Sequence, residues 1–173
     1  MNMPFTEQSR FLDDELFSLT LMATTQRGKL YRANATEAER DALRDALQDA
    51  LAGLTPAYEN AVSDSDHVAN IDALCRRLTA SHGSVLAGGK LRVGSAQKAL
   101  NLHLKYMWCL GRIAMPPHCP LDSTVLKNIP GCGSVRWTQL DSLSEYRHLI
   151  SKARGVAGKE SLAIWELHLY NAG

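Results

Sequence analysis

The chain has 173 residues, of which 45% are hydrophobic and 21% are charged, and its formal net charge is +1. This is the ordinary mixture of a globular protein, so the chain should fold without a partner. It has no apolar run of about 18 residues and no basic segment followed by an apolar one, so we expect a cytoplasmic protein with neither a membrane span nor a secretory signal.

The four cysteines do not form a Cys-x-x-Cys pair, and we expect reduced, mostly buried thiols (Cys75, Cys109, Cys119 and Cys132). Zinc bound by His118, Cys119 and Cys132 is conceivable, but their spacing fits no pattern of zinc ligands. We therefore expect no metal and no cofactor.

The small net charge hides an asymmetry along the chain. Residues 1–75 carry 13 acids and 6 bases, a net charge of −7, whereas residues 76–173 carry 13 bases and 5 acids, a net charge of +8. A basic half suits a polyanion such as nucleic acid, because each neutralised phosphate releases counterions. The alternative is intramolecular, with the acidic half packed beside the basic half.

The first predicted helix spans residues 4–23 and ends before Gly28. Thr6 can cap it, and apolar residues at helical spacing predict a core-facing stripe, namely Phe11, Leu12, Leu16, Leu19 and Met22. A second helix covers 36–53, where Thr36 and Glu39 have the spacing of a capping box. A short helical piece at 55–58 follows.

The same periodicity predicts helices over residues 66–81, 96–110, 123–129, 142–154 and 160–170. We find no alternation of period two that is long enough for a sheet, and no internal repeat. The sequence therefore predicts an all-α protein, with residues 1–173 forming a single globular domain of about seven helices.

The helix at 96–110 is apolar around most of its circumference, which is typical of a buried central helix. Ser95 is its expected N-cap. Lys98 and Lys105 share one stripe, so we expect both to emerge along one edge. Three prolines then keep residues 115–120 extended, and Asp122 caps the helix that follows.

Lys98 and Asp122 are the candidate catalytic residues. A lysine in the first turn of a buried helix lies near the positive end of the helix dipole and in a wall of low dielectric, and both disfavour its ammonium form. Such a lysine can act as a nucleophile and form a Schiff base. An ionised Asp122 facing it would suit substitution at a sugar anomeric carbon, whose transition state is cationic. The alternative is a surface lysine and a simple N-cap.

The order of these elements resembles the helix-hairpin-helix DNA glycosylase superfamily, and is most similar to its 8-oxoguanine-type branches. Leu91-Arg92-Val93-Gly94 corresponds to the hairpin, Lys98 to the Schiff-base lysine, and 120–125 (Pro-Leu-Asp-Ser-Thr-Val) to the aspartate motif. The resemblance covers about 40 residues, at 88–125. The lysine follows Gly94 by four positions where the family has two, and the hairpin lacks the family's proline and middle glycine.

The resemblance implies a DNA-binding, base-excision enzyme that flips a nucleobase out of the stack. Lys98 would displace the base and Asp122 would stabilise the developing positive charge, while Gln97 would contact the base edge. The candidates for stacking on the base are Tyr106, Trp108 or Trp137, for which a place in the core is the alternative. The candidates for contact with the nucleic-acid backbone are Lys90, Arg92, Gly94, Lys105 and Arg112; for the basic side chains, ordinary solvation is the alternative.

Two alternatives remain open at the level of the sequence. One is a helical protein without catalysis that binds nucleic acid or another protein. The other is a metal-independent ribonuclease that uses Arg77 and His82, whose spacing occurs in some such enzymes.

Overall fold

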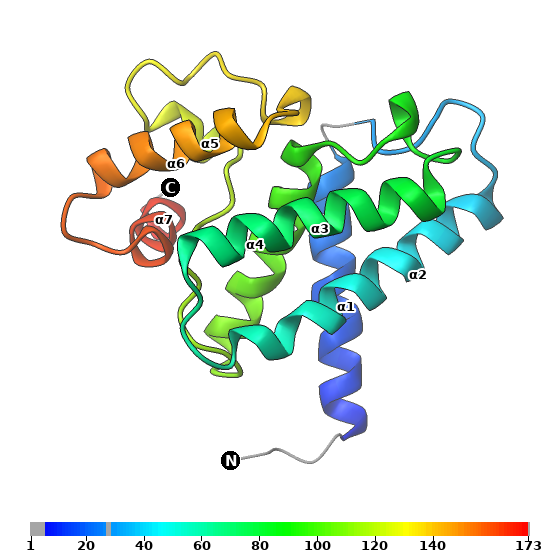
Figure 1. Ribbon diagram of the computed structural model, residues 1–173. Helices are drawn as coiled ribbons and strands as arrows, with labels where there is room; N and C mark the ends of the chain where they lie inside the picture. Colours follow the sequence, from blue (N-terminus) through cyan, green and yellow to red (C-terminus); the bar gives the residue numbers. More distant parts are fainter. Residues whose placement is uncertain (1–5, 27–28, 173) are drawn as a thin grey trace.

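The computed structural model describes residues 6–26 and 29–172. Within these residues the chain forms seven α-helices and no strand, which confirms the predicted all-α class (Figure 1). Pro4 and Gly28, the expected start and terminator of the first helix, lie outside the described residues. The helices are α1 (Glu7–Thr25), α2 (Glu37–Leu54), α3 (Asp64–His82), α4 (Val93–Cys109), α5 (Ser123–Lys127), α6 (Leu143–Ala157) and α7 (Leu162–Asn171).

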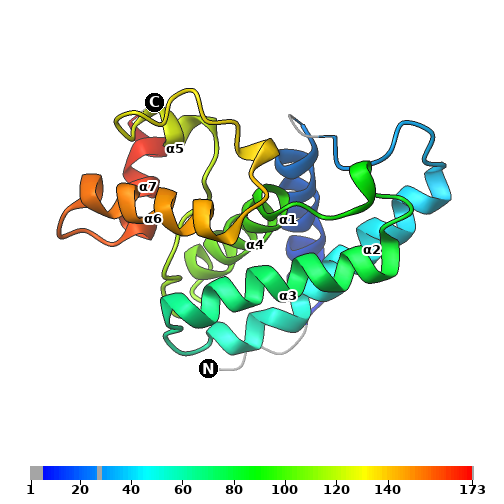
Figure 2. The same ribbon diagram turned by 45° about the horizontal axis from the view of Figure 1, so that its top comes forward.

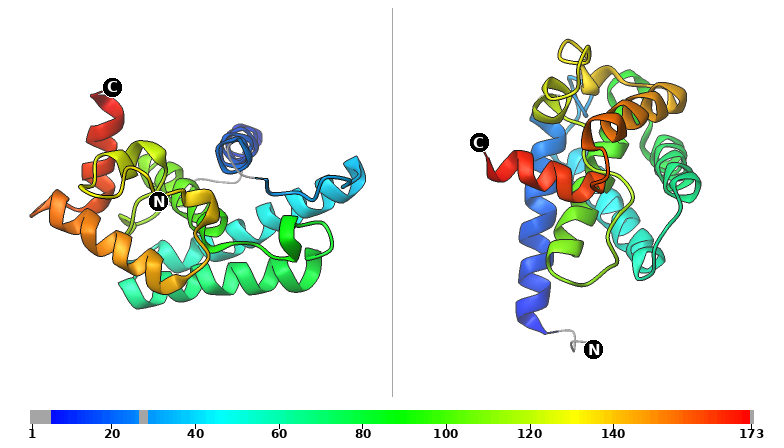
Figure 3. Two further views of the ribbon diagram at one scale, coloured as in Figure 1. Left: turned by 90° about the horizontal axis from the view of Figure 1, so that it is seen from above. Right: turned by 90° about the vertical axis from the view of Figure 1, so that its left-hand side faces the viewer.

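Helix α4 is the centre of the molecule, as its apolar sequence predicted. It packs against α1, α3 and α6 and against the short 3-10 turn Trp137–Gln139. Helix α2 packs beside α3, and Figure 2 and Figure 3 show α1 and this pair on different sides of α4. Helices α6 and α7 pack together at one end of the molecule. Among the described helices, none combines the length and hydropathy of a membrane span.

Helix α4 begins at Val93, three residues before the predicted start, and Ser95 is therefore not its N-cap. Gly94 lies in the first turn and its N–H donates to the Leu140 carbonyl at 2.8 Å. A Cβ at position 94 would lie 1.8 Å from the Trp137 carbonyl oxygen. A glycine is required here because the backbone of the 137–140 turn touches the helix, a contact that periodicity does not reveal.

The predicted core stripe of α1 is wrong. Phe11, Leu12, Leu19 and Met22 are all exposed, whereas the buried side chains of the helix are Phe17, Thr20 and Thr24, with Leu16 partly buried. The threonines were not recognised as core residues because they are polar. Each buried threonine hydroxyl donates to a backbone carbonyl one turn earlier, which removes the cost of its burial (Thr20 to Leu16 at 2.9 Å, Thr24 to Thr20 at 2.7 Å).

The predicted capping signals are largely confirmed. Thr36 and Glu39 form the reciprocal capping box, Thr6 caps α1, and Asp122 caps α5. Helix α3 starts at Asp64, two residues earlier than predicted, because Ser63 rather than a later residue is its N-cap. Helix α5 is shorter than predicted and ends at Lys127.

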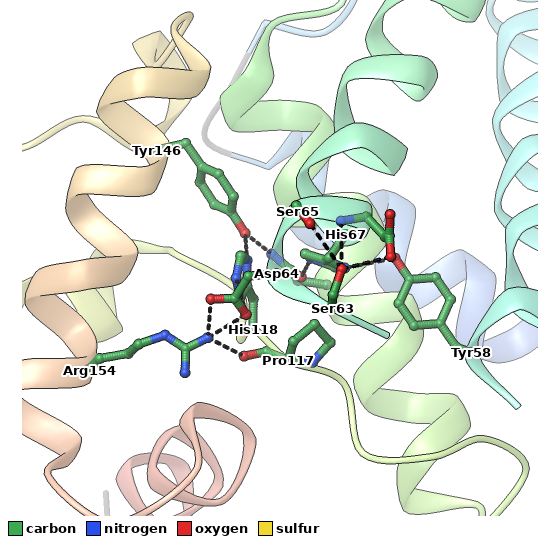
Figure 4. A network of polar contacts seen from close by, with 11 residues as sticks. Tyr58, Ser63, Asp64, Ser65, His67, Pro117, His118, Tyr146 and Arg154 are labelled. Atoms are coloured by element: carbon green, nitrogen blue, oxygen red, sulfur yellow. Dashed lines mark hydrogen bonds and ion pairs between the residues drawn. The ribbon is translucent and has the colours of Figure 1, made fainter. Parts of the chain in front are cut away.

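A polar network crosses the core between α3, α4 and α6 (Figure 4). His67 on α3 and His118 in the 110–122 connector contact edge to face, with ring centroids 4.6 Å apart. Tyr58 hydrogen bonds with His67 Nδ1 at 2.7 Å, and Tyr146 with His118 Nδ1 at 2.8 Å. Burial lowers the pKa of each histidine to about 3, so both are neutral near pH 7.

The requirement for glycine at position 94 predicts opposite effects for two substitutions. Gly94→Ala should destabilise the protein by at least about 1–3 kcal/mol, because Trp137 has to move away from α4. Gly53→Ala, near the end of α2, should be neutral or stabilise by about 0.5–1 kcal/mol, because a Cβ there meets no atom within 4 Å. Urea unfolding of both variants would measure the difference, and equal stabilities would contradict the close contact.

The buried histidines predict a loss of stability in mild acid. In the unfolded chain a histidine titrates near pH 6.5, whereas His67 and His118 have a pKa of about 3 when folded. Between these values the unfolded state binds more protons, so the free energy of unfolding should fall as the pH drops below about 6.5, by up to about 1.4 kcal/mol per pH unit for each histidine.

Urea unfolding at pH 7.5, 6.0 and 5.0 would test this pH dependence. His67→Gln should reduce the slope, while His148→Gln, at an exposed position of α6, should leave it unchanged. A free energy of unfolding that stays constant from pH 7.5 to 5.0 would contradict the neutral, buried state of the two rings.

Candidate nucleic-acid site

Lys98 and Asp122 are in direct contact. The Lys98 Nζ donates to Asp122 Oδ2 at 2.7 Å, and the side chains are only 5% and 12% exposed. Lys98 therefore does not emerge at an edge of α4, as its stripe with Lys105 had suggested. It points at the N-terminus of α5 and forms a partly desolvated ion pair there.

Gln97 is the residue that brings the two chain segments together. Its side-chain amide donates to the Leu121 carbonyl at 2.8 Å and accepts from the Leu121 N–H at 3.0 Å. Since the prolines keep the preceding connector extended, this pair of bonds fixes Asp122 one residue further on, opposite Lys98. Gln97 is fully buried, so its side chain has no exposed surface with which to make the expected contact with a base edge.

Asp122 is held ionised by three donors. Burial opposes its ionisation, but Lys98, the Val125 N–H at 3.0 Å and the Tyr170 hydroxyl at 2.7 Å outweigh burial and hold the pKa of the carboxyl below its ordinary value. Burial, together with the bond to this carboxylate, raises the pKa of Tyr170. The site is therefore an anion between an ammonium and a phenol.

Tyr170 is a site residue that the sequence did not indicate. It lies in the last turn of α7, 48 positions after Asp122, and no motif connects the two. Its ring also lies under the Lys105 ammonium, with Nζ 4.1 Å from the centroid. The packing of α7 against α6 and its contacts with Lys105 on α4 bring it to the site.

Lys105 forms a second inward-facing ion pair. Its Nζ lies 2.8 Å from Glu166 Oε2 and 3.0 Å from Oε1. Burial raises the pKa of Glu166, although Lys105 opposes the shift. Lys105 is thus engaged by α7, and its predicted role in contacting a nucleic-acid backbone is not supported by its position.

A small polar pocket of about 170 Å³ opens over the ion pair. It is lined by groups from α1, α4, α5, α7 and the 137–139 turn, namely Ala23, Gln26, Lys98, Asp122, Ser123, Thr124, Trp137 and Tyr170. Since Lys98 and Asp122 both line this pocket, a ligand that enters it can reach the ion pair.

A larger cavity of about 730 Å³, which we call the basic groove, adjoins this pocket. Ser123 and Trp137 line both. Five cationic side chains line the groove, namely Lys29, Lys90, Arg92, Lys127 and Arg136. The described residues that line it include no aspartate or glutamate. Lys90 is also paired with Asp141 just outside. A groove of this charge can hold phosphates of a nucleic acid.

The remaining predicted site residues do not all lie at the site. Trp137 lines both cavities, whereas Tyr106 and Trp108 are half-buried and are not among the lining residues of either cavity. Arg112 pairs with Asp13 on α1, away from the groove. The N–H of Gly94 is bonded to Leu140, so it does not serve as a phosphate donor.

Arg77 and His82, the alternative ribonuclease pair, lie at the end of α3. Arg77 is exposed, and His82 hydrogen bonds with the adjacent Ser81 at 2.8 Å. Neither Arg77 nor His82 is among the described residues that line the basic groove or the small pocket. Within the described residues no group of three histidine, cysteine or acidic side chains is arranged to hold a metal ion, His118, Cys119 and Cys132 included.

Comparison with models of known protein families, with curated proteins and with solved structures finds no match to this chain. The function is therefore inferred from the geometry of the site and from the motif resemblance at residues 88–125.

The ion pair predicts an asymmetry between two substitutions. Asp122→Ala should cost about 3–5 kcal/mol, because it leaves the Lys98 ammonium buried without a partner. Lys98→Met should cost less, since Asp122 keeps its bonds from Val125 and Tyr170. Chemical denaturation of both variants would measure this, and a larger loss for Lys98→Met would be inconsistent with the pairing.

Proposed function

We propose that the protein binds DNA in the basic groove and acts as a base-excision glycosylase with Schiff-base lyase activity at Lys98 and Asp122. The observation that carries the proposal is the contact of these two residues in a small pocket that adjoins the basic groove. The resemblance at residues 88–125 supports the same chemistry.

The groove and the pocket suit two parts of a nucleic-acid substrate. Arg92, Lys127 and Arg136 would contact phosphates, which gives affinity without sequence preference. A nucleotide that leaves the stack would enter the small pocket beside Trp137, which lines both cavities. The anomeric carbon would then face Lys98.

The proposed reaction begins with loss of a proton from the Lys98 ammonium, for which Asp122 Oδ2 is the adjacent acceptor. The free amine attacks the anomeric carbon as the bond from this carbon to the base breaks. The base leaves with the bonding electrons and takes the proton that Asp122 accepted, so Asp122 is again a carboxylate and stabilises the cationic sugar. The proton of the new secondary ammonium then moves to the ring oxygen as the sugar ring opens, which gives the Schiff base. Tyr170 is a positioning residue, since its hydroxyl holds the carboxylate oxygen that faces Lys98.

Borohydride trapping tests this mechanism. Reduction in the presence of duplexes with an abasic site, 8-oxoguanine or uracil should give a covalent protein–DNA adduct, because borohydride reduces a Schiff base to a stable amine. Lys98→Gln should abolish the adduct. Lys90→Gln, in the groove, should weaken binding but leave the adduct at saturating DNA.

A second candidate is a protein that binds nucleic acid in the same groove without catalysis. The low exposure of the Lys98–Asp122 pair favours this candidate, because an ion pair that only stabilises the fold would be buried in the same way. Salt-sensitive DNA binding with no adduct on any of these duplexes would support this candidate and reject the lyase.

A further inference from the structure

A second cavity lies between α3, α6 and the 110–122 connector, apart from the basic groove. Its volume is about 560 Å³, and its walls are Asp64, Ser65, Val68, His118, Arg147, Ile150, Ser151 and Arg154. It shares no described residue with the groove or the small pocket. Figure 4 shows the polar network that includes His118, Tyr146, Asp64 and Arg154. The positions of the protons in this network determine which groups the cavity presents to a ligand.

The network can be followed from the backbone of Leu121. Its N–H must donate, so the Gln97 oxygen faces it and the Gln97 nitrogen faces the Leu121 carbonyl. The Asn101 nitrogen, which donates to this same Gln97 oxygen at 3.2 Å, also donates to the Tyr146 hydroxyl at 3.1 Å. The orientations of both amides are therefore fixed by the backbone.

Tyr146 then fixes the tautomer of His118. Its hydroxyl accepts from Asn101, so its own proton is directed to His118 Nδ1 at 2.8 Å. A neutral imidazole that accepts at Nδ1 carries its proton on Nε2. Burial lowers the pKa of His118 to about 3, which agrees with a neutral ring.

The His118 Nε2–H is buried without a hydrogen-bond partner among the described residues. Its side chain is 2% exposed, and Asp64 Oδ1 lies 3.3 Å from Nε2, but these two atoms are not in hydrogen-bonding geometry. Both oxygens of Asp64 instead accept from Arg154 Nη2, at 2.7 and 2.9 Å. An unpaired buried donor costs about 1–3 kcal/mol, so an acceptor that reached it would bind favourably.

The charges around this donor favour an anion. Arg147 and Arg154 line the cavity, Ser65 and Ser151 add two hydroxyls, and Asp64 is the one acid among its described walls. The Asp64 carboxylate already occupies the position of an oxyanion beside Arg154. Its side chain is 57% exposed at the start of α3, so it can rotate outward without disturbing the core.

We propose that this cavity is a binding site for the phosphate group of a small phosphorylated molecule, held by the His118 Nε2–H, Arg154 and Arg147. A phosphomonoester has three terminal oxygens and can accept from all three donors at once, whereas the carboxylate of Asp64 bonds only to Arg154. The cavity is larger than a phosphate ion, and Val68 and Ile150 offer an apolar wall to the remainder of the ligand.

The proposal is tested by titrating the full chain, labelled with ¹⁵N-histidine, with inorganic phosphate at constant ionic strength. We expect a saturable shift of the His118 imidazole resonance and a rise in melting temperature. Acetate, a carboxylate of similar size, should bind at least about ten times more weakly. No saturable shift, or equal binding of acetate, would reject a phosphate site.

Two pairs of variants locate the site. Arg154→Gln should weaken phosphate binding about tenfold or more, while Lys152→Gln, an equal change of charge at an exposed position of α6, should not. Asp64→Asn should tighten binding because it removes the internal competitor, while Asp66→Asn in the same turn of α3 should not. All four positions are exposed, so folding should be retained. Equal effects within either pair would show general charge attraction only and would overturn the proposal.

Discussion

Helix α4 carries polar side chains into the interior, and the need to pair them determines much of the structure. Gln97, Lys98 and Asn101 are buried on this helix, where an unpaired amide costs several kcal/mol and an unpaired ammonium costs more. Their partners come from Leu121, Asp122, His67 and Tyr146. These bonds attach the 110–122 connector, α3 and α6 to one helix. Both candidate sites include residues of this polar network that line a cavity: Lys98 and Asp122 at the small pocket, and His118 at the second cavity.

Both candidate sites contain a buried nitrogen donor beside positively charged side chains, but the two donors differ in their partners. At the Lys98–Asp122 pair, a buried cation has its anion, and the adjoining groove supplies further positive charge for a polyanion. At His118, the network ends on a donor that has no hydrogen-bond acceptor among the described residues, beside two arginines. The first arrangement suits chemistry on a bound nucleic acid, and the second suits recognition of a compact anion.

The sequence predicted what local patterns encode. Periodicity and capping residues located the helices, and apolar content identified α4 as central. Lys98 and Asp122 were named from their positions at helix starts, and they are in contact. The predicted core stripe of α1 was wrong because the spacing of apolar residues does not reveal which face of a helix is covered. A buried threonine can also donate its hydroxyl to a backbone carbonyl of its own helix, so polar residues can occupy the covered face. Tyr170 and the His118 donor could not be predicted, since each depends on how α6 and α7 dock.

The attachment of the last two helices to the core has a consequence for local fluctuations. Tyr146 on α6 bonds to His118, and Glu166 on α7 pairs with Lys105 on α4, so neither helix can detach without leaving a buried polar group without that partner. Terminal helices usually fray at little cost, and their amides exchange with solvent early. Here the amides of α6 and α7 should exchange together with those of α4, as parts of one cooperative unit. The residues that hold Asp122 in place would then separate only when this unit opens.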